Sequence, residues 1–109
     1  MMPTHLELLR RLAINDERAL GRLMDGQAID APLLDDKTSA LVNVATLVAM
    51  EAGSPSYQWA VDSAHAAGAE DAEIVDVLRA VAPVVGVARL NAAALSLALA
   101  FGYDLSSQP

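Results

Sequence analysis

A chain of 109 residues has room for one hydrophobic core, which excludes a catalytic domain joined to a separate regulatory domain. Its 14 acidic and 7 basic residues give a formal net charge of −7, which would repel a phosphate backbone and argues against nucleic acid as a partner. The absence of cysteine excludes disulfides, thiolate metal sites and thiol-based catalysis within the chain.

Apolar residues make up 54% of the chain and aromatic residues 4%. This is more apolar surface than a small monomer can bury, so the composition predicts an obligate oligomer. The N-terminus has no basic region followed by a continuous apolar stretch, so we expect no secretory signal. Residues 80–100 could cross a bilayer by length, but Arg89 and Asn91 at their centre argue against a membrane span. We therefore expect a cytoplasmic protein.

The first part of the chain carries apolar residues at intervals of three and four. This spacing predicts two amphipathic helices on either side of residues 15–17, with Asn15 as the N-cap of the second. After a break over 26–32, Asp35 or Asp36 is expected to cap a third helix that runs to about Ala52. This helix is apolar nearly all round, which predicts a central position.

Glycine and proline mark the later helix ends. In the run 53–55, glycine tolerates a left-handed turn, serine caps and proline fits the first helical position, so a fourth helix should begin there and end at Gly68. Acidic residues 70, 71 and 73 favour the start of a fifth helix. Pro83 and Gly86 predict a break before a last helix over about 87–101. The buried stripe of the fifth helix is expected to contain Ile74, Val77, Leu78, Val81 and Val85. Since no strand signal occurs, the sequence predicts an all-α bundle of about six helices.

Four motifs, taken in order, resemble the carboxymuconolactone decarboxylase family, which includes the alkyl hydroperoxidase D-like proteins. They are Thr38–Ala45, Ala66–Ala69, Glu73–Leu78 and Gly86–Ala92. The similarity covers about residues 30–101. It implies a single-domain, alkyl hydroperoxidase D-like helical bundle that assembles as a homo-oligomer, either a trimer or a hexamer. We accordingly divide the chain into an N-terminal helical segment (1–29), the family-like domain (30–103) and a frayed tail (104–109).

The resemblance also shows which catalytic groups are missing. The hydroperoxidase branch carries a Cys-x-x-Cys pair at the start of helix four, a His one turn later and a Glu on helix three. Here Ala60 stands where the His falls, the Glu position falls at Ala40 or Leu41, and neither cysteine is present. The decarboxylase branch shares the spacing from Gly86 to Asn91, but its helix-four His again falls at Ala60 and its later His falls near Leu95. Peroxidase activity is therefore not expected.

Three residues are candidates for catalysis. Asn91 matches the family motif, His65 could titrate near neutrality and act as a base, and Glu51 could act as a substitute acid or base. The alternative for His65 is a surface or interface residue near a helix end, where Asp62 lies three residues away. The alternative for Glu51 is a solvated carboxylate.

Three further residues are candidates for ligand binding. Arg89 could hold the carboxylate of a bound acid, and Tyr57 and Trp59 could line a pocket for a cyclic ligand. The alternatives are a pairing of Arg89 with a carboxylate of another helix or subunit, and packing of the two aromatic residues in the core or between subunits. No spacing indicates a metal site, and we expect no cofactor.

Two functions remain open. The first is a decarboxylase-like protein, a lyase if active, that binds or transforms a small lactone or carboxylic acid in an inter-helix or inter-subunit cavity without thiol chemistry. The second is a catalytically inactive structural or interaction subunit of the family, motivated by the missing cysteines and histidines.

Overall fold

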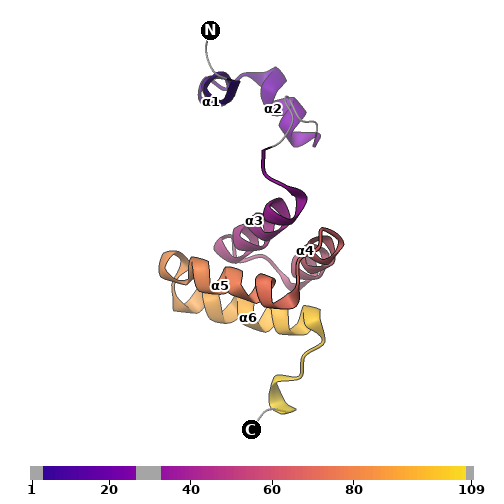
Figure 1. Ribbon diagram of the computed structural model, residues 1–109. Coiled ribbons are helices and arrows are strands. Elements are labelled where there is room, and N and C mark those ends of the chain that lie inside the picture. Colours follow the sequence, from indigo (N-terminus) through magenta and orange to yellow (C-terminus); the bar gives the residue numbers. More distant parts are fainter. Residues whose placement is uncertain (1–3, 27–32, 108–109) are drawn as a thin grey trace. The chain divides into compact units, whose positions relative to one another are not determined.

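The computed structural model describes residues 4–26 and 33–107, and every regular element within these residues is helical (Figure 1). The elements are α1 (Thr4–Ala13), α2 (Glu17–Met24), α3 (Asp36–Ala49), α4 (Ser54–Ala66), α5 (Asp71–Val85), α6 (Val87–Phe101) and the short 3-10 helix η1 (Leu105–Ser107). The predicted all-α fold with about six helices is confirmed. None of the described helices is both long and apolar enough to span a membrane.

The chain divides into two compact units, residues 1–33 and 34–109. In the first unit α1 and α2 contact each other, and the second unit contains α3 to α6 and the main core. Of the break predicted over 26–32, only Gly26 belongs to the described residues, and residues 108–109 of the predicted tail also lie outside them. The segment boundaries at residues 29 and 103 stay predictions.

The N-terminus of α2 is capped by Asp16, so the prediction of Asn15 as the cap is wrong. Asp16 Oδ1 accepts hydrogen bonds from the backbone N–H groups of Arg18 and Ala19 at 3.0 and 3.2 Å. Asn15 has a φ of 61°, a left-handed conformation that asparagine adopts more readily than most residues. Asn15 therefore makes the turn that ends the preceding segment, and the next carboxylate caps the helix.

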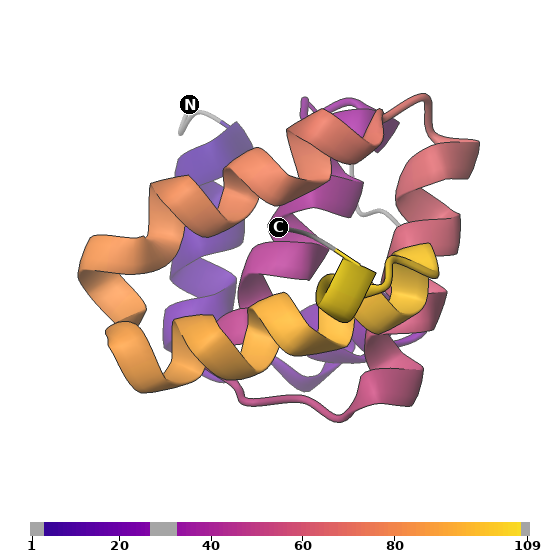
Figure 2. The same cartoon turned by 90° about the horizontal axis from the view of Figure 1, so that it is seen from below.

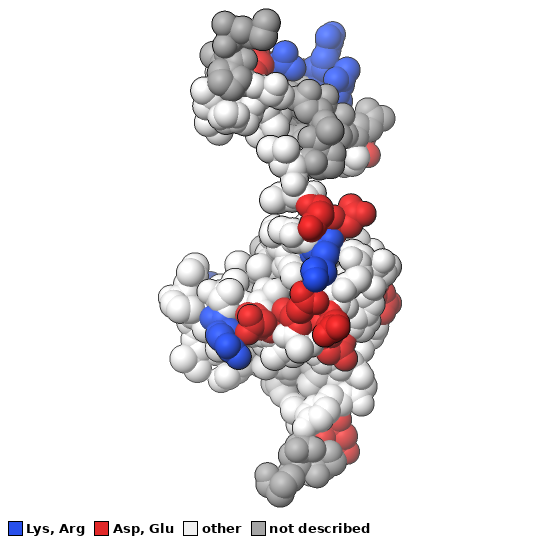
Figure 3. Space-filling model, in the orientation of Figure 1, with Lys and Arg blue, Asp and Glu red and all other residues white. Residues whose placement is uncertain are grey.

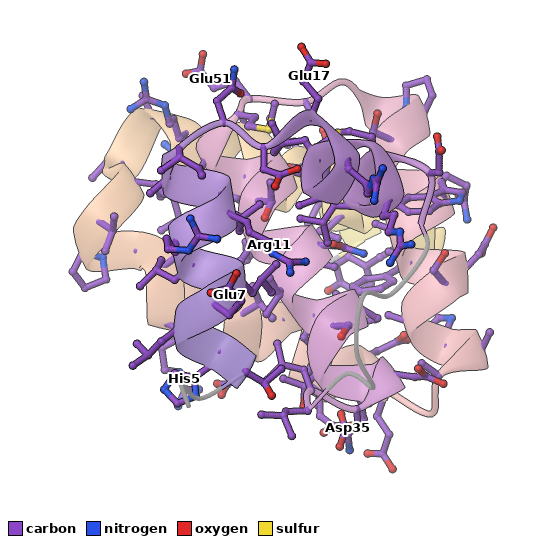
Figure 4. All side chains as sticks on the ribbon, turned by 90° about the horizontal axis from the view of Figure 1, so that it is seen from above. His5, Glu7, Arg11, Glu17, Asp35 and Glu51 are labelled. Atoms are coloured by element: carbon purple, nitrogen blue, oxygen red, sulfur yellow. The ribbon has the colours of Figure 1, made fainter. Side chains whose placement is uncertain are left out.

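The exposed side of α1 carries a three-residue ion cluster. Glu7 accepts hydrogen bonds from Arg10 at 2.8 Å and from Arg11 at 3.1 Å. In Figure 4 the labelled side chains of Glu7 and Arg11 lie next to each other on this helix. The hydrogen bond from Arg10, with that from Arg11, lowers the pKa of Glu7 to about 2. These i, i+3 and i, i+4 pairs support a short helix that has no buried residue of its own.

The ends of α3 differ in how well the sequence predicts them. Asp35, one of the two predicted caps, accepts a hydrogen bond from the Thr38 backbone N–H at 2.7 Å, and hydrogen bonds from Thr38 lower the pKa of the Asp35 carboxyl. Figure 4 shows Asp35 and Glu51 at opposite ends of α3. The helix ends at Ala49, before the predicted Ala52, because the chain turns at Glu51, whose φ is 56°.

The turn between α3 and α4 therefore differs from the prediction. Gly53 has an extended backbone with a φ of −76° and occupies the N-cap position, and Ser54 is already the first residue of α4. Thus Glu51, and not Gly53, makes the left-handed turn, and Ser54 does not cap the helix. Pro55 lies in the first turn, as expected, where its missing backbone donor has no consequence.

The core of the second unit is built around α3, which contacts α4, α5 and α6, as its apolar pattern predicts. Val44 of α3 and Ile74 of α5 are completely buried, and burial of such a side chain stabilises the fold by about 1.5–3 kcal/mol. The predicted stripe of α5 is confirmed, since Ile74 and Val85 are buried and the other members pack partly buried against the core. On the surface, Lys37 Nζ lies 2.8 Å from Glu73 Oε2 and links α3 to α5.

The junction between α5 and α6 is a single glycine, in agreement with the predicted break. Gly86 has a φ of 85° and a ψ of 169°, a backbone conformation that is open almost only to glycine. Pro83 lies inside α5, two residues before its end. The two helices contact each other, and Figure 2 shows that they diverge from this junction.

Candidate functional site

A groove of about 540 Å³ lies along α5, α6 and the residues that follow α6. We call it the apolar groove, because its described lining is mainly aliphatic and aromatic and includes one charged residue, Asp71. Among the lining residues are Val75, Leu78, Ala94, Leu97, Phe101 and Tyr103. Leu97 also belongs to the core, so the groove is formed directly on the packed interior.

His65 lies beside this groove through its contact with Asp71. His65 is in the last turn of α4 and Asp71 is the first residue of α5, so the short turn at Gly68, with a φ of 93°, brings them together. The distance from His65 Nε2 to Asp71 Oδ1 is 2.5 Å. Both positions suit the helix dipoles, since the carboxylate is at a helix N-terminus and the imidazole near a C-terminus.

This pairing determines what His65 can do chemically. When Nε2–H donates to the carboxylate of Asp71, the other ring nitrogen, Nδ1, is left with a lone pair that can accept a proton. A carboxylate that holds an imidazole in this way fixes the ring orientation, as in acid–base sites of hydrolases. Asp62, the neighbour considered from the sequence, instead accepts a hydrogen bond from Gln58 Nε2 at 3.1 Å.

The structure brings together two residues that the sequence predicted separately, Glu51 and Arg89. Arg89 Nε lies 3.3 Å from Glu51 Oε1, and Arg89 Nη1 donates to the backbone carbonyl of Val85 at 3.4 Å. The predicted pairing of Arg89 with a carboxylate of another element is thus present in the structure. Because both side chains are exposed, this ion pair contributes at most about 1 kcal/mol. The guanidinium of Arg89, which a bound acid would need, is therefore already paired with Glu51.

Asn91 lies on a different side of α6 from Arg89. Two positions along an α-helix correspond to a rotation of about 200°, so the two side chains point in nearly opposite directions. Asn91 is exposed, and its side chain makes no hydrogen bond within the described part of the chain. One small ligand cannot contact both residues within a single chain, and the catalytic role of Asn91 stays a prediction.

The two candidate aromatic residues have different environments. Tyr57 is 1% exposed and belongs to the core, and its burial raises the pKa of the phenol. Trp59 is 59% exposed and lines a second groove of about 420 Å³ along α3 and α4. We call this second groove the polar groove, because its lining also includes Asp36, Ser39, Asn43 and Ser63. The core-packing alternative therefore describes Tyr57, whereas Trp59 is a surface residue.

The positions at which the resemblance places the family's histidine and glutamate contain apolar packing. Ala60 and Ala40 are buried members of the core, and Leu41 packs partly buried against it. The described residues contain no group of three histidine, cysteine or carboxylate residues that could hold a metal ion. Acid–base chemistry in the described part of the second unit therefore has to come from other residues. Among these, the His65–Asp71 pair lies beside the apolar groove.

Sequence reasoning missed Asp71 and Tyr103 as site residues. Asp71 is six positions after His65 across a glycine turn, a spacing that a helical periodicity search does not test. Tyr103 follows α6, whose left-handed C-terminal residue Gly102, with a φ of 71°, redirects the chain. One sequence feature could have identified Asp71: it is an acidic residue at the predicted start of a helix, and a histidine precedes it across one short turn.

The sequence model of the Carboxymuconolactone decarboxylase family matches residues 17–100 of this chain. The match includes α2 and extends further towards the N-terminus than the resemblance over residues 30–101. Neither the curated proteins nor the solved structures include a significant match to the chain.

Proposed function

Because the chain belongs to the carboxymuconolactone decarboxylase family, we propose that it binds a small lactone in the apolar groove and that His65, oriented by Asp71, is the proton acceptor there. The observation that carries the proposal is the His65–Asp71 pair at the edge of a groove of about 540 Å³. Small-molecule sites typically have this size, a mainly apolar lining and a few polar groups that fix the orientation of the ligand.

The charge of the groove selects the ligand class. Asp71 is the charged residue among its described lining, so a carboxylate anion would be repelled unless His65 is protonated. An uncharged lactone avoids this repulsion, and its ring fits the aliphatic and aromatic walls. The hydroxyl of Tyr103 can donate a hydrogen bond to a ring or carbonyl oxygen. We therefore favour the lactone over the free acid as the ligand of this groove.

The reaction that suits these groups is proton removal without thiol chemistry. His65 Nδ1 would accept a proton from the carbon next to the lactone carbonyl, and the electron pair of the broken C–H bond would form the enolate. The imidazolium, stabilised by the Asp71 carboxylate, would then return the proton to another atom of the substrate. Proton transfer by a positioned side chain typically accelerates a reaction by about 10²–10⁴-fold. On an uncharged lactone this step moves one proton and breaks no carbon–carbon bond, so it is an isomerisation. The lyase activity that the family suggests would require a lactone that also carries a carboxylate, from which CO2 leaves.

A catalytically inactive subunit of the family is the second candidate. Its support is the apolar packing at Ala60, which corresponds to the family's histidine, and at Ala40 and Leu41, either of which can correspond to the glutamate. This candidate needs no ligand in the apolar groove, so ligand binding discriminates between the two.

A thermal-shift screen against small lactones and matched carboxylic acids tests the proposal. A ligand at 100 times its dissociation constant stabilises the native state by about 2.7 kcal/mol, which raises the melting temperature measurably. We expect lactones to raise it in the wild type and in the control Ala49→Phe, which changes an exposed residue outside the groove, but not in Ala94→Phe, which fills the groove.

His65→Gln separates binding from chemistry. We expect this variant to keep the lactone-induced thermal shift and to lose turnover. A screen without any lactone shift, or equal shifts in Ala94→Phe and Ala49→Phe, would contradict the proposal and favour the inactive subunit.

A further inference from the structure

One side of α6 is apolar and exposed, although the helix is otherwise part of the core. Val87, Leu95 and Leu99 are 73%, 58% and 71% exposed, and Asn91 completes a row with steps of four residues. We call Val87, Asn91, Leu95 and Leu99 the outer face of α6. Residues four apart form one ridge on a helix surface, and such ridges pack into the grooves of another helix.

The outer face is also the part of α6 without charge. The helix carries a single charged residue, Arg89, which points away from the outer face and is paired with Glu51. On the face of the second unit that Figure 3 shows, acidic and basic side chains gather in a band, and much of the remaining surface is uncharged. Because each copy has a net charge of −7, two copies repel each other least where no acidic residue lies between them.

The position of Asn91 fits a second copy of the same chain. An asparagine side chain has one donor group and one acceptor group, so two amides related by a two-fold axis can hydrogen-bond to each other. With the axis at Asn91 and the helices antiparallel, Val87 meets Leu95 of the second copy, because both are four positions from the axis. Ala88 and Ala92 flank Asn91, and their short side chains allow the two backbones to approach closely.

We propose that the outer face of α6 pairs two copies of this chain in an antiparallel, two-fold contact centred on Asn91. A single polar residue within an apolar helix seam fixes the register of the pairing at some cost in stability. A two-fold contact makes the same surface serve both partners, and it can be part of a dimer or of a hexamer. This inference assigns Asn91 to assembly and does not depend on the lactone site.

Sedimentation velocity at micromolar concentration provides the test. We expect the wild type to be a dimer or a larger even assembly. Val87→Glu and Leu95→Lys, each alone, should weaken the pairing at least tenfold. The double variant should restore it, because the introduced acid and base would face each other across the axis. Val42→Lys, on an exposed part of α3, is the matched control and should leave assembly unchanged. A monomeric or trimeric wild type, or two disruptive single variants without rescue in the double variant, would overturn the proposal.

The absence of cysteine allows a second readout. Asn91→Cys would introduce the only thiol of the chain, next to its symmetry mate, and diamide would oxidise the two thiols to one disulfide. Gln58→Cys, on the exposed side of α4, is the control. A covalent dimer on a non-reducing gel for Asn91→Cys and not for Gln58→Cys supports the contact. Equal crosslinking of both variants, or of neither, contradicts it.

Discussion

The apolar groove and the polar groove are similar in volume, about 540 and 420 Å³, but differ in the chemistry of their walls. The apolar groove is lined by core-facing residues such as Leu97 and has the His65–Asp71 pair at its edge. The polar groove presents Asn43 and the exposed Trp59. The difference shows that size alone does not select a site: the apolar groove places an exposed base and carboxylate beside an apolar wall, whereas the polar groove offers hydroxyl, amide and carboxylate groups.

The largest expected effect is a difference in stability between variants at a lining residue of each groove. Leu97→Ala removes a side chain that is 2% exposed and should lower the free energy of unfolding by about 2–5 kcal/mol. Asn43→Ala, in the polar groove, should change it by no more than about 0.5 kcal/mol. Urea unfolding followed by circular dichroism measures both. Similar losses for the two variants would show that the grooves are equally integrated into the core.

A smaller effect is expected at the junction that sets the two helical walls of the apolar groove. Gly86→Ala should destabilise the protein by about 1–3 kcal/mol, because the backbone conformation at Gly86 disfavours any Cβ although nothing lies within 4 Å of it. Gly21→Ala, inside α2 and equally unhindered, should instead stabilise by about 0.5–1 kcal/mol. Thermal unfolding of both variants provides the measurement. A neutral Gly86→Ala would mean that the junction can rearrange.

The charge of the apolar groove can be changed without filling it. Asp71→Asn should improve binding of a carboxylic acid relative to its lactone by roughly fivefold, since one unit charge at about 4 Å in water is worth about 1 kcal/mol. Asp36→Asn, the corresponding change in the polar groove, should leave this ratio unchanged. Isothermal titration of both ligands gives the ratio. Equal ratios in the two variants would argue that the acid binds elsewhere.

The smallest effect concerns the ion pair between Lys37 and Glu73, which links α3 to α5. The hydrogen bond from Lys37, helped by one from the Glu70 backbone N–H, lowers the pKa of Glu73. A carboxylate with a lowered pKa contributes stability above its ordinary pKa of 4.5 and loses it as the pH falls below that value. Lys37→Met should therefore raise the pKa of Glu73 and weaken the acid dependence of stability. A carboxyl-carbon NMR titration measures this, with Arg79→Met as a control that should leave Glu73 unchanged.

Local signals explain which parts of the fold were predictable. Asp35 and Gly86 act within one turn of their own position, so the sequence alone predicts the cap and the break. Glu51 takes a left-handed conformation that glycine usually adopts, and the true glycine, Gly53, is extended. Which of the two residues turns depends on the packing of α3 against α4, and the conformational preferences of single residues carry no information about that packing.

The candidate site was less predictable than the fold for the same reason. His65 could be identified as a base from its residue type, but its partner Asp71 and its groove depend on the arrangement of three elements. The Arg89–Glu51 pair was anticipated only as a pairing with some carboxylate. Arg89 and Asn91 point in nearly opposite directions because they are two positions apart on a helix. This could be derived from the sequence once the last helix was predicted.

The central claim is that a lactone occupies the apolar groove next to His65. An NMR titration of the isotope-labelled protein with γ-butyrolactone tests it most directly, since each amide and ring reports on its own surroundings. The account predicts chemical-shift changes at Val75, Ala94 and Tyr103 and at the His65 ring, with the Trp59 indole unchanged. Changes centred on Trp59 and Asn43, or no changes at saturating lactone, would contradict it.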